Sequence, residues 1–249
     1  MGNRLEMTVD YASHEASELH QHPIVKEQRN ALSMPPLFFS SAQTQILVMI
    51  GANGPMTVRE MARARSVDSA STFRTTERLE RSGLVVKREL PGGRKYISVN
   101  RSHVAYRNLS RLLEVLVDHY QIPRVAQARY RHGLPLERDP SPALQEDKMF
   151  GSVLRSRLLV LLAAVEEADV TQLARLLGAN RCSAYYTAHA LLKSRLLLAE
   201  TVGIRNVLRL NDSFIGAQEY IAFLSKLFRE APVYGVLKSL VPQITFRWK

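Results

Sequence analysis

The fold of this chain is decided by residues 57–100, which read TVREMARARSVDSASTFRTTERLERSGLVVKRELPGGRKYISVN. Thr57 is a favourable N-cap for a short helix, because apolar residues follow it at the helical spacing i, i+3 and i+4. Asp68 or Ser69 can cap a second helix. This helix is expected to end at Arg81, because the glycine two residues later accepts the left-handed backbone that closes helices.

Two β-strands are expected after the second helix, over residues 84–90 and 94–99. The Pro-Gly-Gly sequence between them has the chemistry of a hairpin turn. A further helix is expected before the quoted stretch, over about 41–52, and Asn-Gly-Pro stops it. The order helix, turn, helix, hairpin predicts a winged helix-turn-helix.

Part of this stretch resembles a known family. Residues 79–88, LERSGLVVKR, look like the end of a recognition helix and the first wing strand in regulators of the MarR and ArsR type. Arg94 and Lys95 stand where such proteins carry basic wing residues, while Gly93 takes a position that is usually acidic in MarR-type wings. The resemblance implies a bacterial, DNA-binding transcriptional regulator.

The charge of the chain also points to a polyanionic partner. The net charge is +11 and the sequence pI is near 10.0. Residues 41–101 hold 11 Lys and Arg against 5 Asp and Glu, whereas residues 1–40 hold 3 against 5. The positive charge therefore gathers on the expected winged helix, and double-stranded DNA is the first candidate partner.

The second half of the chain repeats the first. Residues 44–86 align without a gap on residues 156–198, and apolar positions stay in phase over four elements. This internal repeat predicts a second winged helix. Residues 123–147 are rich in proline and charge, which is typical of a linker, with one short helix expected at 125–131.

We therefore expect a mainly α fold with small β-hairpin wings (α+β), built from two tandem winged helix-turn-helix domains. Each hairpin should be followed by an amphipathic helix, at 101–120 and 214–229, and apolar residues at helical spacing continue from residue 231. The expected organisation is a polar N-terminal arm at 1–36, a first domain at 37–122, a linker at 123–147 and a second domain at 148–249.

The repeat also indicates which face of each recognition helix is buried. Positions that are small or apolar in both copies should face the core, namely Thr72, Thr76 and Leu79 in the first and Ala184, Ala188 and Leu191 in the second. The outward residues, together with the basic wing residues, are the candidate DNA-binding set. This set comprises Ser69, Ser71, Phe73, Arg74, Thr75, Arg78, Arg94 and Lys95 in the first copy, and Arg181, Ser183, Tyr185, Tyr186, His189 and Arg205 in the second.

Arg74 and Arg78 lie one helical turn apart and are suited to bidentate contact with guanine or phosphate. The alternative to a role in DNA binding is that Arg74 and Arg78 form surface ion pairs with Glu77 or Asp68. Phe73 can touch a thymine methyl group or pack against the wing. The second surface is less basic, and its tyrosines suit either stacking on DNA or a protein interface.

No motif in the sequence indicates catalysis, a cofactor or a metal. Phosphate-loop, HExxH and GxGxxG patterns are absent from the sequence. His20 and His22 have no third ligand nearby, so surface histidines are the favoured interpretation. Cys182 is the single cysteine, and a buried structural role is favoured over a nucleophile. No apolar run reaches the ~18 residues that a membrane span needs.

These observations favour a sequence-specific repressor in the cytoplasm, associated with the nucleoid, with no enzymatic activity and no membrane partner. Homodimerisation stays open. Two alternatives also stay open. A plasmid replication initiator has a similar plan of two linked winged helices and would bind origin repeats. A complex-assembly protein would use winged helices as protein interfaces.

Overall fold

The computed structural model describes residues 34–90, 93–120, 122, 148–202 and 205–241. By its internal contacts the chain divides into residues 1–34 and residues 35–249, and every element named below lies in the second unit. Several expectations fall outside the described residues: the arm up to residue 33, the histidine pair at positions 20 and 22, the linker with its short helix, and the tail after residue 241. Within the described ranges, no helix combines the length and hydrophobicity that a bilayer span requires.

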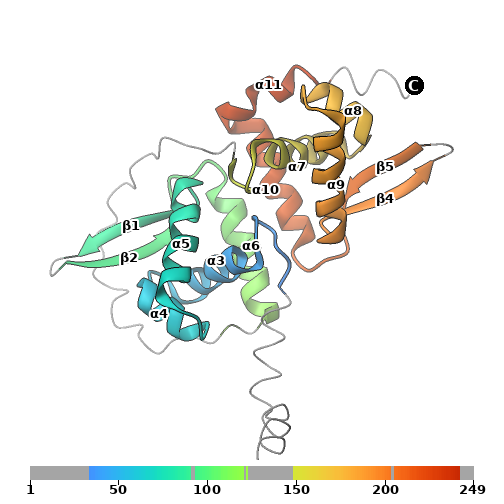
Figure 1. Cartoon of the computed structure of the whole chain (residues 1–249). Coiled ribbons are helices and arrows are strands. Elements are labelled where there is room, and N and C mark those ends of the chain that lie inside the picture. The colour runs from blue at the N-terminus through green and yellow to red at the C-terminus, as the bar shows by residue number, and fades with distance from the viewer. Residues whose placement is uncertain (1–33, 91–92, 121, 123–147, 203–204, 242–249) are drawn as a thin grey trace, which may run out of the picture. The chain divides into compact units, whose positions relative to one another are not determined.

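The first set of elements has the predicted order of a winged helix (Figure 1). The three helices before the hairpin and both hairpin strands lie within one or two residues of the predicted bounds, which confirms those predictions. The elements are α3 (Ser41–Asn53), α4 (Val58–Ala64), α5 (Ser69–Arg81), β1 (Val85–Leu90), β2 (Arg94–Val99) and α6 (Tyr106–Tyr120).

The predicted capping residues account for these helix ends. The Thr57 side chain accepts a hydrogen bond from the Glu60 backbone N–H, and the Glu60 carboxylate accepts one from the Thr57 N–H, so α4 begins with a capping box. Asp68, rather than Ser69, caps α5, because its Oδ1 accepts from the Ser71 N–H at 2.7 Å. Gly83 has a positive φ of 74°, as its closing role requires.

The second set of elements follows the same order, with one short strand added. The added strand, β3, pairs with β5, so the sheet order is β3-β5-β4. In the first set Met56 forms only an isolated bridge to Ile97. The elements are α7 (Val153–Val165), β3 (Glu167–Asp169), α8 (Val170–Leu176), α9 (Arg181–Lys193), β4 (Leu197–Val202), β5 (Arg205–Leu210), α10 (Ala217–Glu230), the 3₁₀-helix η3 (Pro232–Tyr234) and α11 (Gly235–Lys238).

Equivalent positions of the two sets carry equivalent contacts. Ser40 and Ser152 cap α3 and α7, and Asp169 forms a capping box like that of Thr57. Asn180 caps α9, as its counterpart Asp68 caps α5. The repeat in the sequence is therefore also a repeat in local hydrogen bonding.

The helix predicted from residue 101 begins later, at Tyr106, so that prediction was wrong at its start. The reason is the side chain of Asn100. Its Nδ2 donates to the Gly83 carbonyl at 2.8 Å, and its Oδ1 accepts from the Ser102 N–H at 3.0 Å. This local bonding holds residues 101–105 in turns.

The helix predicted from residue 214 shows the same difference and begins at Ala217. Asn211 is the equivalent of Asn100. Its Nδ2 donates to the Arg195 carbonyl at 2.7 Å and its Oδ1 accepts from the Ser213 N–H at 2.9 Å. After each hairpin, an asparagine side chain therefore forms a hydrogen bond with the residues that follow the preceding helix. The helix after the hairpin consequently begins later than predicted.

Four aromatic rings join the two sets of elements. Phe38 precedes α3, Phe150 precedes α7, and Tyr220 and Phe223 come from α10. The rings of Phe38 and Phe150 are stacked with centroids 6.2 Å apart, and Tyr220 and Phe223 meet them edge-on. All four side chains are buried, so the cluster excludes water from the junction.

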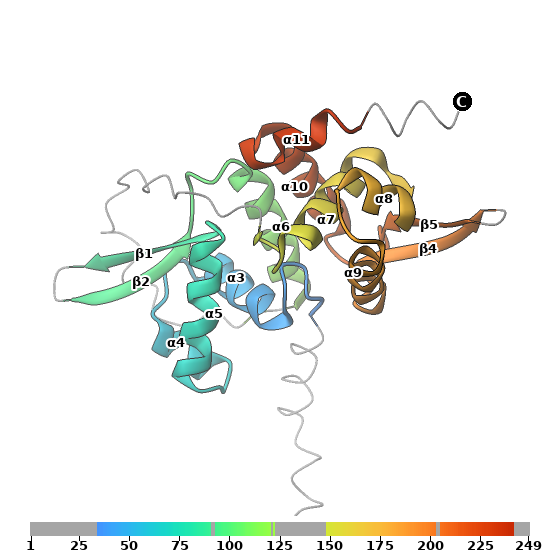
Figure 2. The same cartoon turned by 45° about the horizontal axis from the view of Figure 1, so that its top comes forward.

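The helices that follow the hairpins also pack on one another. Figures 1 and 2 both show α6 and α10 side by side, and α10 in turn packs on α7. The contact is close at Gly216, where an added Cβ would lie 3.0 Å from Leu112 Cδ1 and where φ is +80°. The apolar stripe predicted for α6 is thus packed core, with Leu109, Leu112, Leu113 and Leu116 all buried.

A first prediction concerns the hydroxyl of Tyr220, which donates to the Leu37 carbonyl at 2.7 Å inside the junction. Tyr220→Phe should lower the free energy of unfolding by roughly 1–3 kcal/mol, because the buried carbonyl loses its donor. Chemical denaturation measures the change. Tyr186→Phe is the control, since that side chain is 72% exposed and should leave stability unchanged. Equal stability of the wild type and Tyr220→Phe would contradict the role of this bond.

A second prediction concerns His103, whose ring stacks on Phe223 at 6.0 Å. Burial lowers the pKa of His103 from 6.5 to about 4. Below pH ~6.5 the imidazole is protonated in the unfolded chain, whereas in the folded chain it stays neutral down to pH ~4. The free energy of unfolding should therefore decrease by up to ~3 kcal/mol as the pH falls from ~6.5 to ~4. Unfolding curves at several pH values measure this loss. In His103→Gln that part of the pH dependence should vanish, and an unchanged slope would refute the assignment.

Candidate nucleic-acid interface

Helix α5 presents the predicted face to solvent. Thr72, Thr76 and Leu79 are fully buried, which confirms the predicted inner face. The outer residues are fixed by the same helical phase. Ser69, Ser71, Phe73, Arg74 and Arg78 are exposed, and Thr75 is half-buried with its hydroxyl donating to the Ser71 carbonyl.

Arg74 and Arg78 of α5 form no ion pair with the acidic residues beside them. Asp68 is occupied as the N-cap of the helix. Neither Arg74 nor Arg78 forms an ion pair among the described residues, with Glu77 or with any other carboxylate. Both guanidinium groups are therefore available to an anionic partner.

Phe73 lies against the wing. The Lys87 Nζ of β1 sits 5.2 Å from the centroid of the Phe73 ring, and the same ammonium pairs with Glu80 at 2.5 Å. The ring nevertheless stays 45% exposed. Of the two roles considered, packing against the wing is thus observed, while the exposed edge still leaves room for a base.

The wing carries exposed positive charge at its tip. Arg94 and Lys95 begin β2, opposite Leu90 and Glu89. Lys95 Nζ lies 3.7 Å from the Glu89 carboxylate, but both side chains are more than half exposed, so this pair stabilises little. Arg94 and Lys95 can therefore meet a phosphate without losing a strong partner.

Helix α9 presents a different surface. Ala184, Ala188 and Leu191 are buried, as predicted. Tyr185 and Tyr186 are 57% and 72% exposed, and the Tyr185 ring stacks on His189 with centroids 6.2 Å apart. Arg181 and Ser183 are also exposed, while Arg205 starts β5. The face is thus an aromatic ridge with little charge of its own.

One expectation for this helix was wrong. Cys182 is exposed, not buried. The helical phase explains why: Cys182 precedes the inward Ala184 by two residues, and two residues turn a helix by about 200°. No group of three His, Cys, Asp or Glu residues in the described part of the chain could hold a metal ion.

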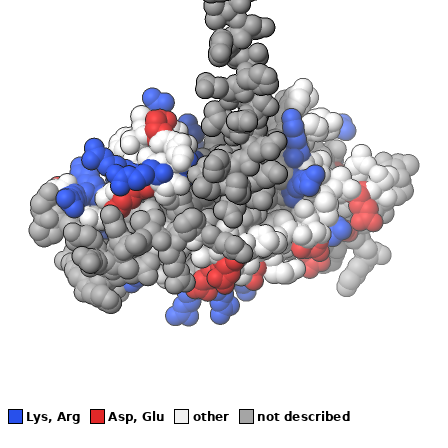
Figure 3. All heavy atoms as spheres, turned by 90° about the horizontal axis from the view of Figure 1, so that it is seen from below, with Lys and Arg blue, Asp and Glu red and all other residues white. Residues whose placement is uncertain are grey.

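The candidate set omitted basic residues on neighbouring elements. Arg59 and Arg63 are exposed on α4, and Lys87 lies beside Phe73 on β1. In Figure 3, Lys and Arg side chains gather on the left, the side on which β1 and β2 lie in Figure 1. The charge balance of residues 41–101 was the available signal, but it does not say which elements meet in space.

Residues 39–95 match the model of the MarR family. This match covers α3, α4, α5, β1 and the start of β2, so a MarR-family winged-helix domain lies there. It confirms the MarR part of the resemblance. A search of curated proteins found no match to the chain. A MarR-family domain supports, in general terms, a DNA-binding transcriptional regulator.

Proposed function

We propose that this chain is a sequence-specific repressor that binds double-stranded DNA through α5 and the β1-β2 wing and acts by occupying its operator. The observation that carries the proposal is the exposed face of α5, where Arg74 and Arg78 lack ion pairs among the described residues. The short polar side chains at the start of α5 suit phosphate or base contacts. The proposed place of action is the cytoplasmic nucleoid, and no catalytic step is involved.

We further propose that residues 37–122 and 148–249 form two tandem winged-helix domains, with 123–147 as their linker. The repeated capping contacts and the two post-hairpin asparagines support this division. The packing of α6 on α10 and the stacked phenylalanines hold both domains in one body. One chain would then offer two helices to DNA, as the two subunits of a dimer do.

The aromatic ridge of α9 favours a second candidate for that domain alone. Exposed tyrosines are common at protein interfaces, and the ridge offers few cations to a phosphate backbone. The second domain would in that case bind a protein partner while the first binds DNA. A replication initiator remains an alternative use of the same two domains, and binding to several direct repeats instead of one operator would identify it.

The prediction that tests base contact compares Arg74 with Lys95. Arg74→Ala should cost ~1–3 kcal/mol of binding free energy on the selected operator and relax the preference at one base pair. Lys95→Ala should weaken binding to every sequence alike. Selection of sites from random DNA, followed by titration of each variant, measures both. Arg107→Ala on the exposed side of α6 is the control, and equal losses on specific and random DNA for Arg74→Ala would reject the base-contact role.

A further prediction is that the first domain makes more phosphate contacts with DNA than the second. Its test uses the full chain, because separated domains would expose the aromatic cluster that they share. The double variant Arg74→Ala/Arg78→Ala should flatten the dependence of DNA affinity on salt by up to two phosphate contacts, each worth about 0.9 in the log–log slope. The double variant Tyr185→Ala/Tyr186→Ala should leave that slope unchanged, because tyrosines neutralise no phosphate. A reversed result would assign the phosphate contacts to α9 instead.

A further inference from the structure

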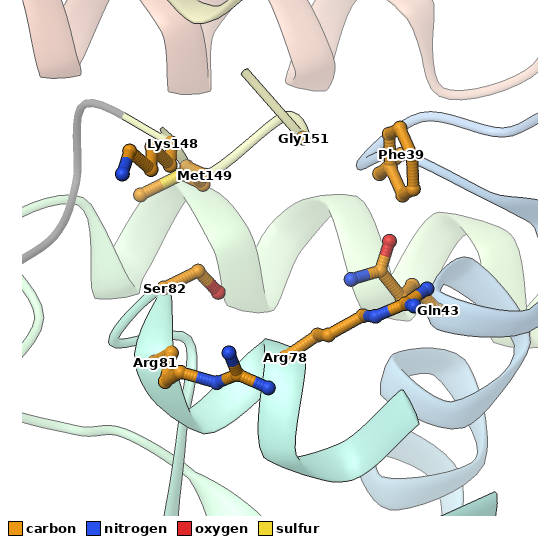
Figure 4. A pocket seen from close by; sticks show the side chains of 8 residues that line it. All are labelled: Phe39, Gln43, Arg78, Arg81, Ser82, Lys148, Met149 and Gly151. Carbon is orange, nitrogen blue, oxygen red and sulfur yellow. The ribbon is translucent and has the colours of Figure 1, made fainter. Parts of the chain in front are cut away.

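A cavity of about 330 Å³ lies beside the C-terminal end of α5 (Figure 4). Three stretches that are distant in the sequence line it. Phe39 precedes α3 and Gln43 lies in its first turn, Arg78 and Arg81 come from α5, and Lys148 and Met149 come from the segment before α7. The segment before α7 lies outside the residues that match the MarR family.

The lining of the cavity is cationic. Two arginines and one lysine border it, and no carboxylate of the described residues does. Arg78 and Arg81 have no ion-pair partner within the described ranges, and neither does Lys148. The side of the cavity formed by Phe39 and Met149 is apolar. A ligand that fits would therefore join a multiply charged anion to a small apolar group.

Gln43 adds an independent indication of a ligand. Its side chain borders the cavity, is only 4% exposed, and its Oε1 has no hydrogen-bond partner among the residues that the structure describes. The backbone of this residue is fixed, because Ser40 Oγ accepts from the Gln43 N–H at the start of α3. Figure 4 shows Arg78 extending from α5 toward this carboxamide. A ligand hydroxyl would satisfy Oε1, or the amide turned by 180° would donate its N–H to an anion.

We propose that this cavity binds a small phosphate monoester. Arginine guanidinium groups match phosphate oxygens in charge and in forked geometry, and a phosphate carries the two negative charges that the three cations favour. Inorganic phosphate alone fills a minor part of the volume, which leaves space for an apolar substituent against Phe39 and Met149. Arg78 belongs both to this cavity and to the α5 face of the proposed DNA interface, so ligand and DNA would compete for one guanidinium group; this last point alone rests on the proposed function.

The test is calorimetric titration of the full chain with phenyl phosphate and with inorganic phosphate at constant ionic strength. We expect saturable binding of one phenyl phosphate per chain, tighter than that of inorganic phosphate. Arg81→Ala should weaken it about tenfold or more, since a charge-assisted hydrogen bond is lost. Gln43→Glu should abolish it, because a carboxylate in the lining repels the anion. Arg107→Ala, at an exposed arginine of α6 outside the cavity, should bind as the wild type does.

Three results would overturn the site: binding that does not saturate, equal losses in Arg81→Ala and Arg107→Ala, or tighter binding of succinate than of phenyl phosphate. Arg81→Ala alters an exposed side chain and keeps the test valid if Gln43→Glu does not fold. The titration contains no DNA, so its outcome is independent of the DNA-binding proposal. In a separate DNA titration, saturating phenyl phosphate should weaken DNA binding by the wild type, and an unchanged DNA affinity would overturn the sharing of Arg78.

Discussion

The stacking of Phe38 on Phe150 is the contact on which the arrangement of this chain depends. The two residues are 112 positions apart, which is the period of the internal repeat, so each set of elements contributes the same residue to the same contact. Tyr220 and Phe223 close the cluster from α10. Rings of this size bury large apolar areas, and a junction made from them is rigid on the scale of side-chain packing.

The sequence predicted most of the local structure, because caps and helical phase are local properties. Thr57 and Asp68 start the helices that they were expected to start, and the inner face of α5 follows from small or apolar residues at i, i+4 and i+7. Cys182 shows the opposite case. Its burial was inferred from the usual behaviour of cysteine, whereas the phase of its own helix points it to solvent.

What the sequence could not predict depends on contacts between distant segments. The cavity brings Phe39, Arg78 and Lys148 together from three places in the chain, and no spacing rule connects them. The late start of α6 depends on Asn100 reaching back to Gly83, a hydrogen bond over seventeen residues. Packing of Phe73 against the wing was one of two expected roles, but its partner Lys87 could be identified only once the wing was seen folded back on α5.

The joining of two similar halves within one chain affects how the occupancy of a DNA site would depend on the concentration of the protein. If a monomeric chain occupies one half-site with each half, occupancy rises with the first power of chain concentration, because no association of subunits precedes binding. A substitution in one half then changes one half-site only, whereas in a homodimer it would change both. In such a monomer each half can evolve toward its own target sequence, and a defective chain does not inactivate an intact one by forming a mixed dimer with it.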